Sequence, residues 1–219
     1  VSIYAGRATD VNQLKVNTLA VAGNAGIIAV GLNVAIADQY SKNRAIVTVA
    51  PTGTAQAGLS VTGQLTVEAN SAATAQATVY GVSAGGLSIL VSFAVAVLRN
   101  TQEATVTGTG TLQAGSLAII ARLNENDAPA AAAEIGTGAG GLISANVLVA
   151  VAYGRSSNLA TLTVRRFVVT NAAELLSSGS AIVTAYTQNL SNIGYSFTAA
   201  VMVGLAYAQS NFEARVTLT

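Results

Sequence analysis

The sequence repeats itself about every 55 residues, and this repetition constrains the fold more than any single motif. A segment that begins at Gly85-Gly86 and continues through Phe93-Ala94-Val95-Ala96-Val97 returns from Gly140-Gly141, 55 residues later. Related segments lie at 31–38 and 198–207. Repetition at a fixed period predicts one supersecondary unit that is copied along the chain, with each copy burying its apolar face against the next.

Each unit contains a short segment with strand periodicity and a longer segment rich in Ala and Val. The short segments alternate apolar and polar residues, at 63–69 and 115–121, with related versions at 12–17 and 179–185. The longer segments are largely apolar on both faces, so periodicity alone leaves helix as the competing interpretation. Paired glycines, β-branched residues and the absence of a capping box favour strand. The sequence therefore predicts an all-β protein with less than about 15% helix.

The repeats divide residues 1–219 into units of one continuous domain. After each long segment a polar turn is expected to lead into another strand, at 45–49, 104–107, 160–164 and 214–218. The predicted units are 1–43, 44–102, 103–157 and 158–211, with a fifth that begins at 212–219. The two middle units are expected to carry an extra segment, at Thr74–Ala84 and Ala130–Ala139. The chain opens on Val rather than Met, which favours a piece of a longer protein.

A β-solenoid of about four such units is the predicted architecture. A four-bladed propeller and a transmembrane barrel are the alternatives, although unequal unit lengths disfavour the propeller and missing aromatic girdles disfavour the barrel. The long segments are apolar on both faces, with Phe93, Val95 and Val97 on one side and Ala94 and Ala96 on the other. We expect the outer face to be mostly Ala and Gly. Either the fold itself covers this face or a second copy does.

Composition excludes several classes of function. Histidine and cysteine are both absent, which removes catalytic triads, thiol nucleophiles and the usual zinc ligands. A net charge of +1, with no basic cluster larger than Arg165-Arg166, argues against nucleic acid as a partner. With 52% hydrophobic and 9% charged residues, little repulsion keeps copies apart, so self-association is expected.

Two groups of residues are candidates for a specific role. Asn124-Glu125-Asn126-Asp127 gathers carboxylate and amide oxygens, which suit calcium, and a solvated turn is the alternative. The glycines Gly85, Gly86, Gly140 and Gly141 are predicted to lie at bends where the backbone turns with positive φ or approaches a neighbour closely. No other cofactor is expected.

Carboxylates and tyrosines offer two further possibilities. A carbohydrate-active enzyme needs two carboxyl groups facing one groove, yet only Glu125 and Asp127 are close in sequence and Trp is absent. We therefore predict no enzyme and keep a carbohydrate-active β-helix as the alternative. Tyr153 and Tyr207, with Leu98 at the matching place in the repeat, are expected to form a packed ladder, and surface sugar binding is the alternative.

The repeat also resembles a known group of proteins. The run from Gly115 to Ala121, a Gly/Ala-rich segment, a Val-Ala-Val-Ala strand, an Asn-bearing turn and Ala-Thr-Val-Thr at 104–107 are similar to the filamentous-haemagglutinin-like and leukotoxin-like filamentous adhesins. These are repetitive bacterial surface exoproteins. The resemblance implies a rod-like β-solenoid, extracellular or at the cell surface, that builds an adhesin, sheath or filament. Its partners would be further copies, flanking repeats of a longer chain, or a host or surface receptor.

Overall fold

The protein is all-β. The computed structural model describes residues 1–6, 14–51, 58–123, 129–179, 182–190 and 197–218. Strands make up 94% of these residues and none of them is helical. Since about one-third of residues in an average globular protein are helical, the prediction of strand over helix is confirmed for this part of the chain.

The strands run parallel and form two sheets. They are β1 (Ser2–Ala5), β2 (Leu14–Val49), β3 (Leu59–Ser71), β4 (Ala73–Gly108), β5 (Thr111–Leu123), β6 (Pro129–Val164), β7 (Arg166–Val169), β8 (Ala173–Gly179), β9 (Ile182–Leu190) and β10 (Phe197–Leu218). The first sheet has the order β1-β3-β5-β7, with β8 also beside β5. The second has the order β10-β6-β4-β2, with β9 also beside β6.

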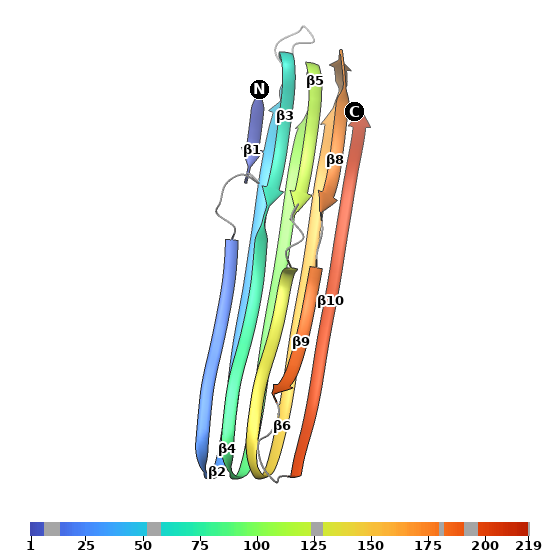
Figure 1. Ribbon diagram of the computed structural model, residues 1–219. Coiled ribbons are helices and arrows are strands. Elements are labelled where there is room, and N and C mark those ends of the chain that lie inside the picture. The colour runs from blue at the N-terminus through green and yellow to red at the C-terminus, as the bar shows by residue number, and fades with distance from the viewer. Residues whose placement is uncertain (7–13, 52–57, 124–128, 180–181, 191–196, 219) are drawn as a thin grey trace.

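The second sheet folds back on itself because its long strands bend. β2, β4 and β6 each descend one side of the molecule, bend at its lower end and return along the other side (Figure 1). The first sheet continues the descending side upward, and both termini lie toward the upper end (Figure 1). The result is a long, narrow body of two layers, consistent with a β-solenoid.

Neighbouring strands pair at long and nearly constant separations in sequence. Gly26 pairs with Gly85, 59 residues later, Gly85 pairs with Gly141 after 56, and Tyr153 pairs with Tyr207 after 54. The predicted match of Gly85 to Gly140 was wrong by one residue, since Gly140 pairs with Ala84. Because Ala, Val and Gly recur throughout, two repeats aligned one residue out of register still look similar in sequence. Such a shift assigns every side chain to the opposite face of the strand.

Other details of the predicted repeat were also wrong. The strand at 63–69 pairs with Ser2–Ala5 rather than with 12–17, and the strand at 117–123 pairs with 173–179 rather than with 179–185. Thr74–Ala84 is no extra segment, because it pairs throughout with Lys15–Ala25. Similarly, residues 131–138 pair with 183–190.

The expected polar turn after each long segment is absent from β2, β4 and β6. These strands continue without a break from the long segment into the next predicted strand. The polar residues Asn43, Gln102 and Asn158 occupy one register position within them. In the sequence, these polar residues predicted a solvent-exposed turn. In the structure their amide groups point into the space between the layers, where Gln102 and Asn158 are fully buried and Asn43 is partly buried.

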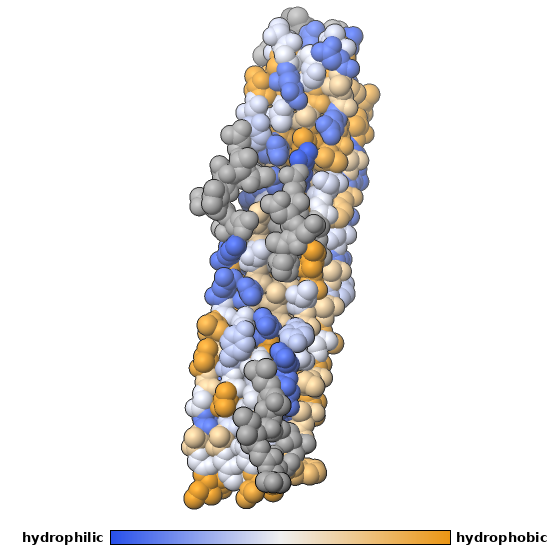
Figure 2. Space-filling view, viewed as in Figure 1, coloured by the Kyte–Doolittle hydropathy of each residue, from blue (hydrophilic) through white to orange (hydrophobic). Residues whose placement is uncertain are grey.

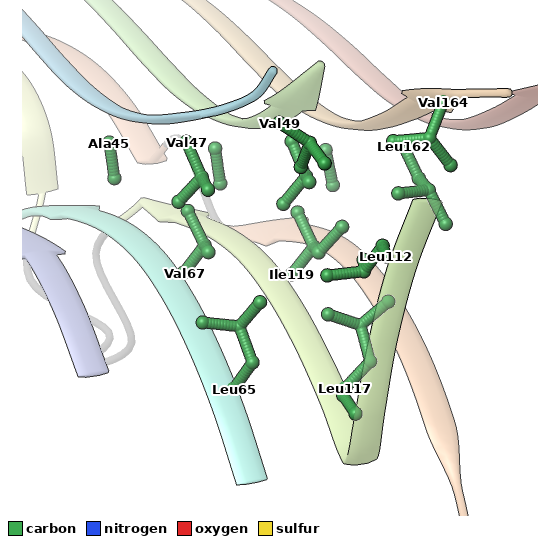
Figure 3. Packing of buried hydrophobic residues seen from close by; sticks show 14 of the residues in the cluster. Ala45, Val47, Val49, Leu65, Val67, Leu112, Leu117, Ile119, Leu162 and Val164 are labelled. Carbon is green, nitrogen blue, oxygen red and sulfur yellow. The ribbon is translucent and has the colours of Figure 1, made fainter. Parts of the chain in front are cut away.

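Two hydrophobic clusters fill the interior at different heights. The upper cluster contains large aliphatic side chains, among them Leu65, Leu112 and Ile119, which meet Val47 and Leu162 from the opposite layer (Figure 3). The lower cluster is dominated by alanine, with Ala94 and Ala96 of the returning strand in one cluster with Ala75 and Ala77 of the descending strand. Small side chains allow the two layers to approach closely there.

The alanines face inward, so the expectation of an Ala/Gly outer face was wrong. Ala94 and Ala96 are fully buried, while Phe93, Val95 and Val97 alternate with them and are partly exposed. The side chains with the greater apolar area therefore point away from the core. This arrangement is the opposite of the usual one in a half-buried strand.

Candidate interaction surfaces

The predicted calcium ligands Asn124, Glu125, Asn126 and Asp127 lie outside the described residues. Calcium binding at these positions therefore stays a prediction. Within the described ranges, no group of three or more Asp and Glu side chains is placed to hold a metal ion.

The glycines lie at the lower bend, where neighbouring backbones are in close contact. A Cβ atom on Gly85 would overlap the carbonyl oxygen of Gly26, and one on Gly141 would overlap that of Gly85. Gly141 also has a positive φ of 156°. A Cβ on Gly86 would lie 3.0 Å from the carbonyl oxygen of Ile27. At Gly85 and Gly141, successive bends therefore stack backbone on backbone, with no room for a side chain.

A layer of buried amides separates the two hydrophobic clusters, and we call it the amide layer (Asn43, Asn70, Asn100, Gln102 and Asn158). The Nδ2 atom of Asn43 donates to the carbonyl oxygen of Asn70 at 2.6 Å. Asn158, at the same register position, donates to Ser178 at 2.6 Å. The first bond joins β2 to β3 and the second joins β6 to β8, so both link the second sheet to the first.

Other members of the amide layer are not satisfied in this way. Both amide atoms of Gln102 and both of Asn100 have no hydrogen-bond partner among the described residues. Both side chains are buried. A buried polar atom without a partner lowers stability, so Gln102, with neither amide atom paired, is less favourable than Asn158, whose Nδ2 is paired although its Oδ1 has no partner among the described residues.

The outward side of the returning strands forms a flat apolar surface, which we call the apolar flank. Strand register places its side chains in five rows across β2, β4, β6 and β10. Its members are Ile28, Val30, Leu32, Val34, Ile36, Leu87, Ile89, Val91, Phe93, Val95, Ile143, Ala145, Val147, Val149, Val151, Phe197, Ala199, Val201, Val203 and Leu205. None of them is polar, and those of β2 and most of those of β10 are strongly exposed.

The apolar flank is large for an exposed surface. Four strands at about 4.8 Å and ten residues at about 3.3 Å give an area of about 600 Å². This estimate equals the upper end of the largest apolar patches on ordinary monomers, which are often functional. The patch continues to the lower end of the molecule, where Ile27 and Leu142 are exposed at the bends. Figure 2 shows hydrophobic residues gathered at this end and along the edge formed by β10.

Above the apolar flank the same face becomes polar. Tyr153 and Tyr207 mark the boundary and stack with ring centroids 5.3 Å apart and planes 6° from parallel. The predicted tyrosine ladder is thus present between these two residues, but the matching position in β4 is Val97, while Leu98 is buried in the core. Further up, Thr105 and Thr161 are hydrogen-bonded at 2.9 Å.

Ion pairs connect neighbouring strands in this polar part. Arg99 Nη2 lies 2.8 Å from Asp38 Oδ2. Arg44 forms two bonds to Glu103, with Nε 2.6 Å from Oε2 and Nη2 3.2 Å from Oε1. The hydrogen bond to Glu103 and the charge of its carboxylate raise the pKa of Arg44 above its ordinary value. These pairs lie within one chain and are solvent-exposed, so each adds little to stability.

The two ends of the sheet differ. β2 has β4 as its only neighbour among the described strands, yet its inward residues Ala35 and Ala37 are fully buried. Among the described strands β10 pairs only with β6, and its inward residues are open to solvent: Met202 is 51% exposed and Leu218 62%. The facing strand β9 lies against β10 near Gly204 but is only nine residues long, which leaves most of the inward side chains of β10 exposed.

Comparison with known proteins identifies no relative: no family model, no curated protein and no solved structure matches the chain. In the described part of the chain, no helix is long and apolar enough to cross a membrane.

Proposed function

We propose that this chain is a structural, self-associating segment of an extracellular bacterial adhesin, sheath or filament. In this proposal it is one β-solenoid domain of about four coils, each of about 55 residues. The near-constant separations of paired residues, 59, 56 and 54, support that division. Its partners are further copies or flanking repeats, and it requires no cofactor, with calcium at Asn124–Asp127 as an addition still to be tested.

The observation that carries this proposal is the open side of β10. Its inward residues Met202, Phe212, Val216 and Leu218 continue the buried columns of β6, yet they are exposed. Its backbone also offers hydrogen bonds along 22 residues to a further parallel strand. One more coil, from this chain's continuation or from a second copy, would bury these side chains and pair this edge.

The opposite end supplies a surface suited to the contact. The free edge of β2 is 36 residues long, and inward side chains of this strand such as Ala35 and Ala37 are buried. An open end that meets a closed end makes a head-to-tail contact, which repeats without closing and gives a filament. Few charges oppose this stacking, since the whole chain carries a net charge of +1.

The test places charges on the inward side of β10. Met202→Lys combined with Phe212→Lys should leave each molecule folded, because both side chains are exposed in the single molecule. Stacking would bury both ammonium groups without partners, so end-to-end association should be lost. Gln209→Lys with Asn211→Lys is the matched control, since these residues lie on the outward side of the same strand.

Sedimentation velocity and negative-stain microscopy measure the outcome. We expect concentration-dependent rods for the unchanged protein and for the control, and short particles for the Met202/Phe212 variant. The proposal fails if the unchanged protein shows no end-to-end association at any concentration, or if both lysine variants associate equally.

A further inference from the structure

We infer that the apolar flank is a second self-association surface, on which a second copy packs face to face with its lower end pointing the opposite way. This inference deepens the proposed function by naming a lateral contact. The contact itself is independent of that function, but its role in building a larger assembly rests on it. Stacking through β10 lengthens the column of coils, whereas packing through the flank would join two columns side by side.

The area of the flank matches what a stable dimer requires. At about 600 Å² per copy, a flank-to-flank contact buries about 1,200 Å² in total, the lower limit for specific protein–protein interfaces. The exposed residues at the lower bend and the tyrosine row add to this area. A surface of twenty apolar side chains without a polar group is a poor match for water or for a polar partner.

The shape of the flank favours another sheet over a different partner. Its side chains are mainly β-branched and stand in straight rows across four strands in register. Two such faces pack as the layers of a β-sandwich do, about 10 Å apart. A second copy supplies an identical face, and an interface between identical faces closes by two-fold symmetry.

Charge on the same face selects the orientation. Two basic side chains, Lys42 and Arg155, lie just above the apolar rows, next to the ion pairs Arg99–Asp38 and Arg44–Glu103. If both lower ends pointed the same way, these basic groups would face each other across the interface, which is unfavourable. When the lower ends point in opposite directions, each apolar flank overlaps the other and the basic groups of the two copies lie far apart.

This orientation is also compatible with stacking. The two-fold axis then runs along the direction in which strands are added, so both copies present β10 toward the same end of the pair. Lateral pairing therefore leaves the open side of β10 free to accept a further coil in each column.

The experiment uses the Met202→Lys/Phe212→Lys variant as its background, because that variant removes the end-to-end contact. In this background Val34→Thr with Val95→Thr introduces hydroxyls into the flank on β2 and β4. Threonine suits this sheet, as Thr105 and Thr161 already occupy outward positions on the same face. The matched control is Val21→Thr with Val82→Thr, which changes exposed valines on the descending side of the same two strands.

We expect the background protein and the control to be dimers, and the flank variant to dissociate with a dissociation constant higher by about tenfold or more. Unchanged far-UV circular dichroism shows that each variant is folded. A monomeric background protein, or equal dissociation constants for flank and control variants, would overturn the inference. If the unchanged protein forms dimers and nothing larger, the end-to-end proposal fails while the flank contact stands.

Orientation and the competing lipid partner are tested separately. The chain contains no cysteine, so Leu142→Cys at the lower bend gives one site for a spin label. Opposite orientation predicts a label-to-label distance of about 35 Å, and parallel orientation predicts less than about 20 Å.

Flotation with phosphatidylcholine and phosphatidylserine vesicles tests lipid binding. The inference is overturned if the background protein is monomeric in solution and floats with the vesicles, and if Val34→Thr with Val95→Thr abolishes flotation. That result would show that the flank binds lipid.

Discussion

At the residue scale, glycines allow close backbone contact at the bends and amide side chains form hydrogen bonds between the layers. Aliphatic residues can do neither. Gly85 and Gly141 allow the backbones of successive bends to touch. Asn43 and Asn158 hold the two layers together where the alanine and leucine clusters meet. Both tasks depend on a single atom being present or absent, so substitutions at Gly141 and at Asn158 should each lower stability.

Gly141→Ala should destabilise the protein by about 1–3 kcal/mol, because the added Cβ would overlap the carbonyl oxygen of Gly85. Gly63→Ala is the control, since a Cβ at Gly63 would meet nothing within 4 Å. Urea unfolding followed by circular dichroism gives both values. Equal stabilities of the two variants would contradict the close backbone stacking at the bend.

Asn158→Leu should destabilise by about 1–3 kcal/mol, because it leaves the carbonyl oxygen of Ser178 without its partner. Gln102→Leu, at the same register position, should be neutral or stabilising, since neither amide atom of Gln102 has a partner among the described residues. Thermal unfolding of the two variants under one set of conditions measures the difference. A loss of stability for Gln102→Leu as large as that for Asn158→Leu would contradict this assignment.

At the element scale, each long strand carries different side chains on its two sides and at its two heights. The lower interior is narrow because Ala94 and Ala96 face Ala75 and Ala77, whereas the upper interior holds leucine and isoleucine (Figure 3). On the outside the order is reversed, with large apolar side chains below and threonines and ion pairs above. One strand therefore contributes to the core, the flank and the polar upper face.

Ala96→Leu should destabilise the protein by about 1–3 kcal/mol, because Ala96 is fully buried between layers that have no space for three more carbon atoms. Val97→Leu changes the adjacent outward residue and should alter stability by less than about 0.5 kcal/mol. Denaturant unfolding of the pair tests which side of the strand is the core side. The reverse order of effects would place valine, rather than alanine, in the interior.

At the scale of the whole molecule, the two proposed contacts lie at right angles to each other. The open side of β10 faces along the direction of strand addition, and the apolar flank faces away from both layers. Ion pairs such as Arg44–Glu103 are satisfied within one chain and make no demand on a partner. The lysine variants of β10 and the threonine variants of the flank separate the two contacts, because each pair changes one surface and leaves the other intact.

The all-β fold class and its repetitive character follow from the sequence alone. Period-2 alternation, β-branched residues and the return of the same segment about every 55 residues require parallel copies of one strand-rich unit. The sequence also indicated two of the bends, since paired glycines precede the long apolar segments of the two middle units, at Gly85-Gly86 and Gly140-Gly141. These features are local, so they can be read without knowing what lies across the interior.

Only the tertiary structure decided which side of each long strand is the core. Phe93, Val95 and Val97 are more hydrophobic than Ala94 and Ala96, so local hydrophobicity places the wrong set inside. The distance between the two layers reverses that choice, because the cluster where the descending and returning halves face each other is built mainly from alanine. The same facing layer supplies the carbonyl groups that bind Asn43 and Asn158, which the sequence alone had assigned to polar turns.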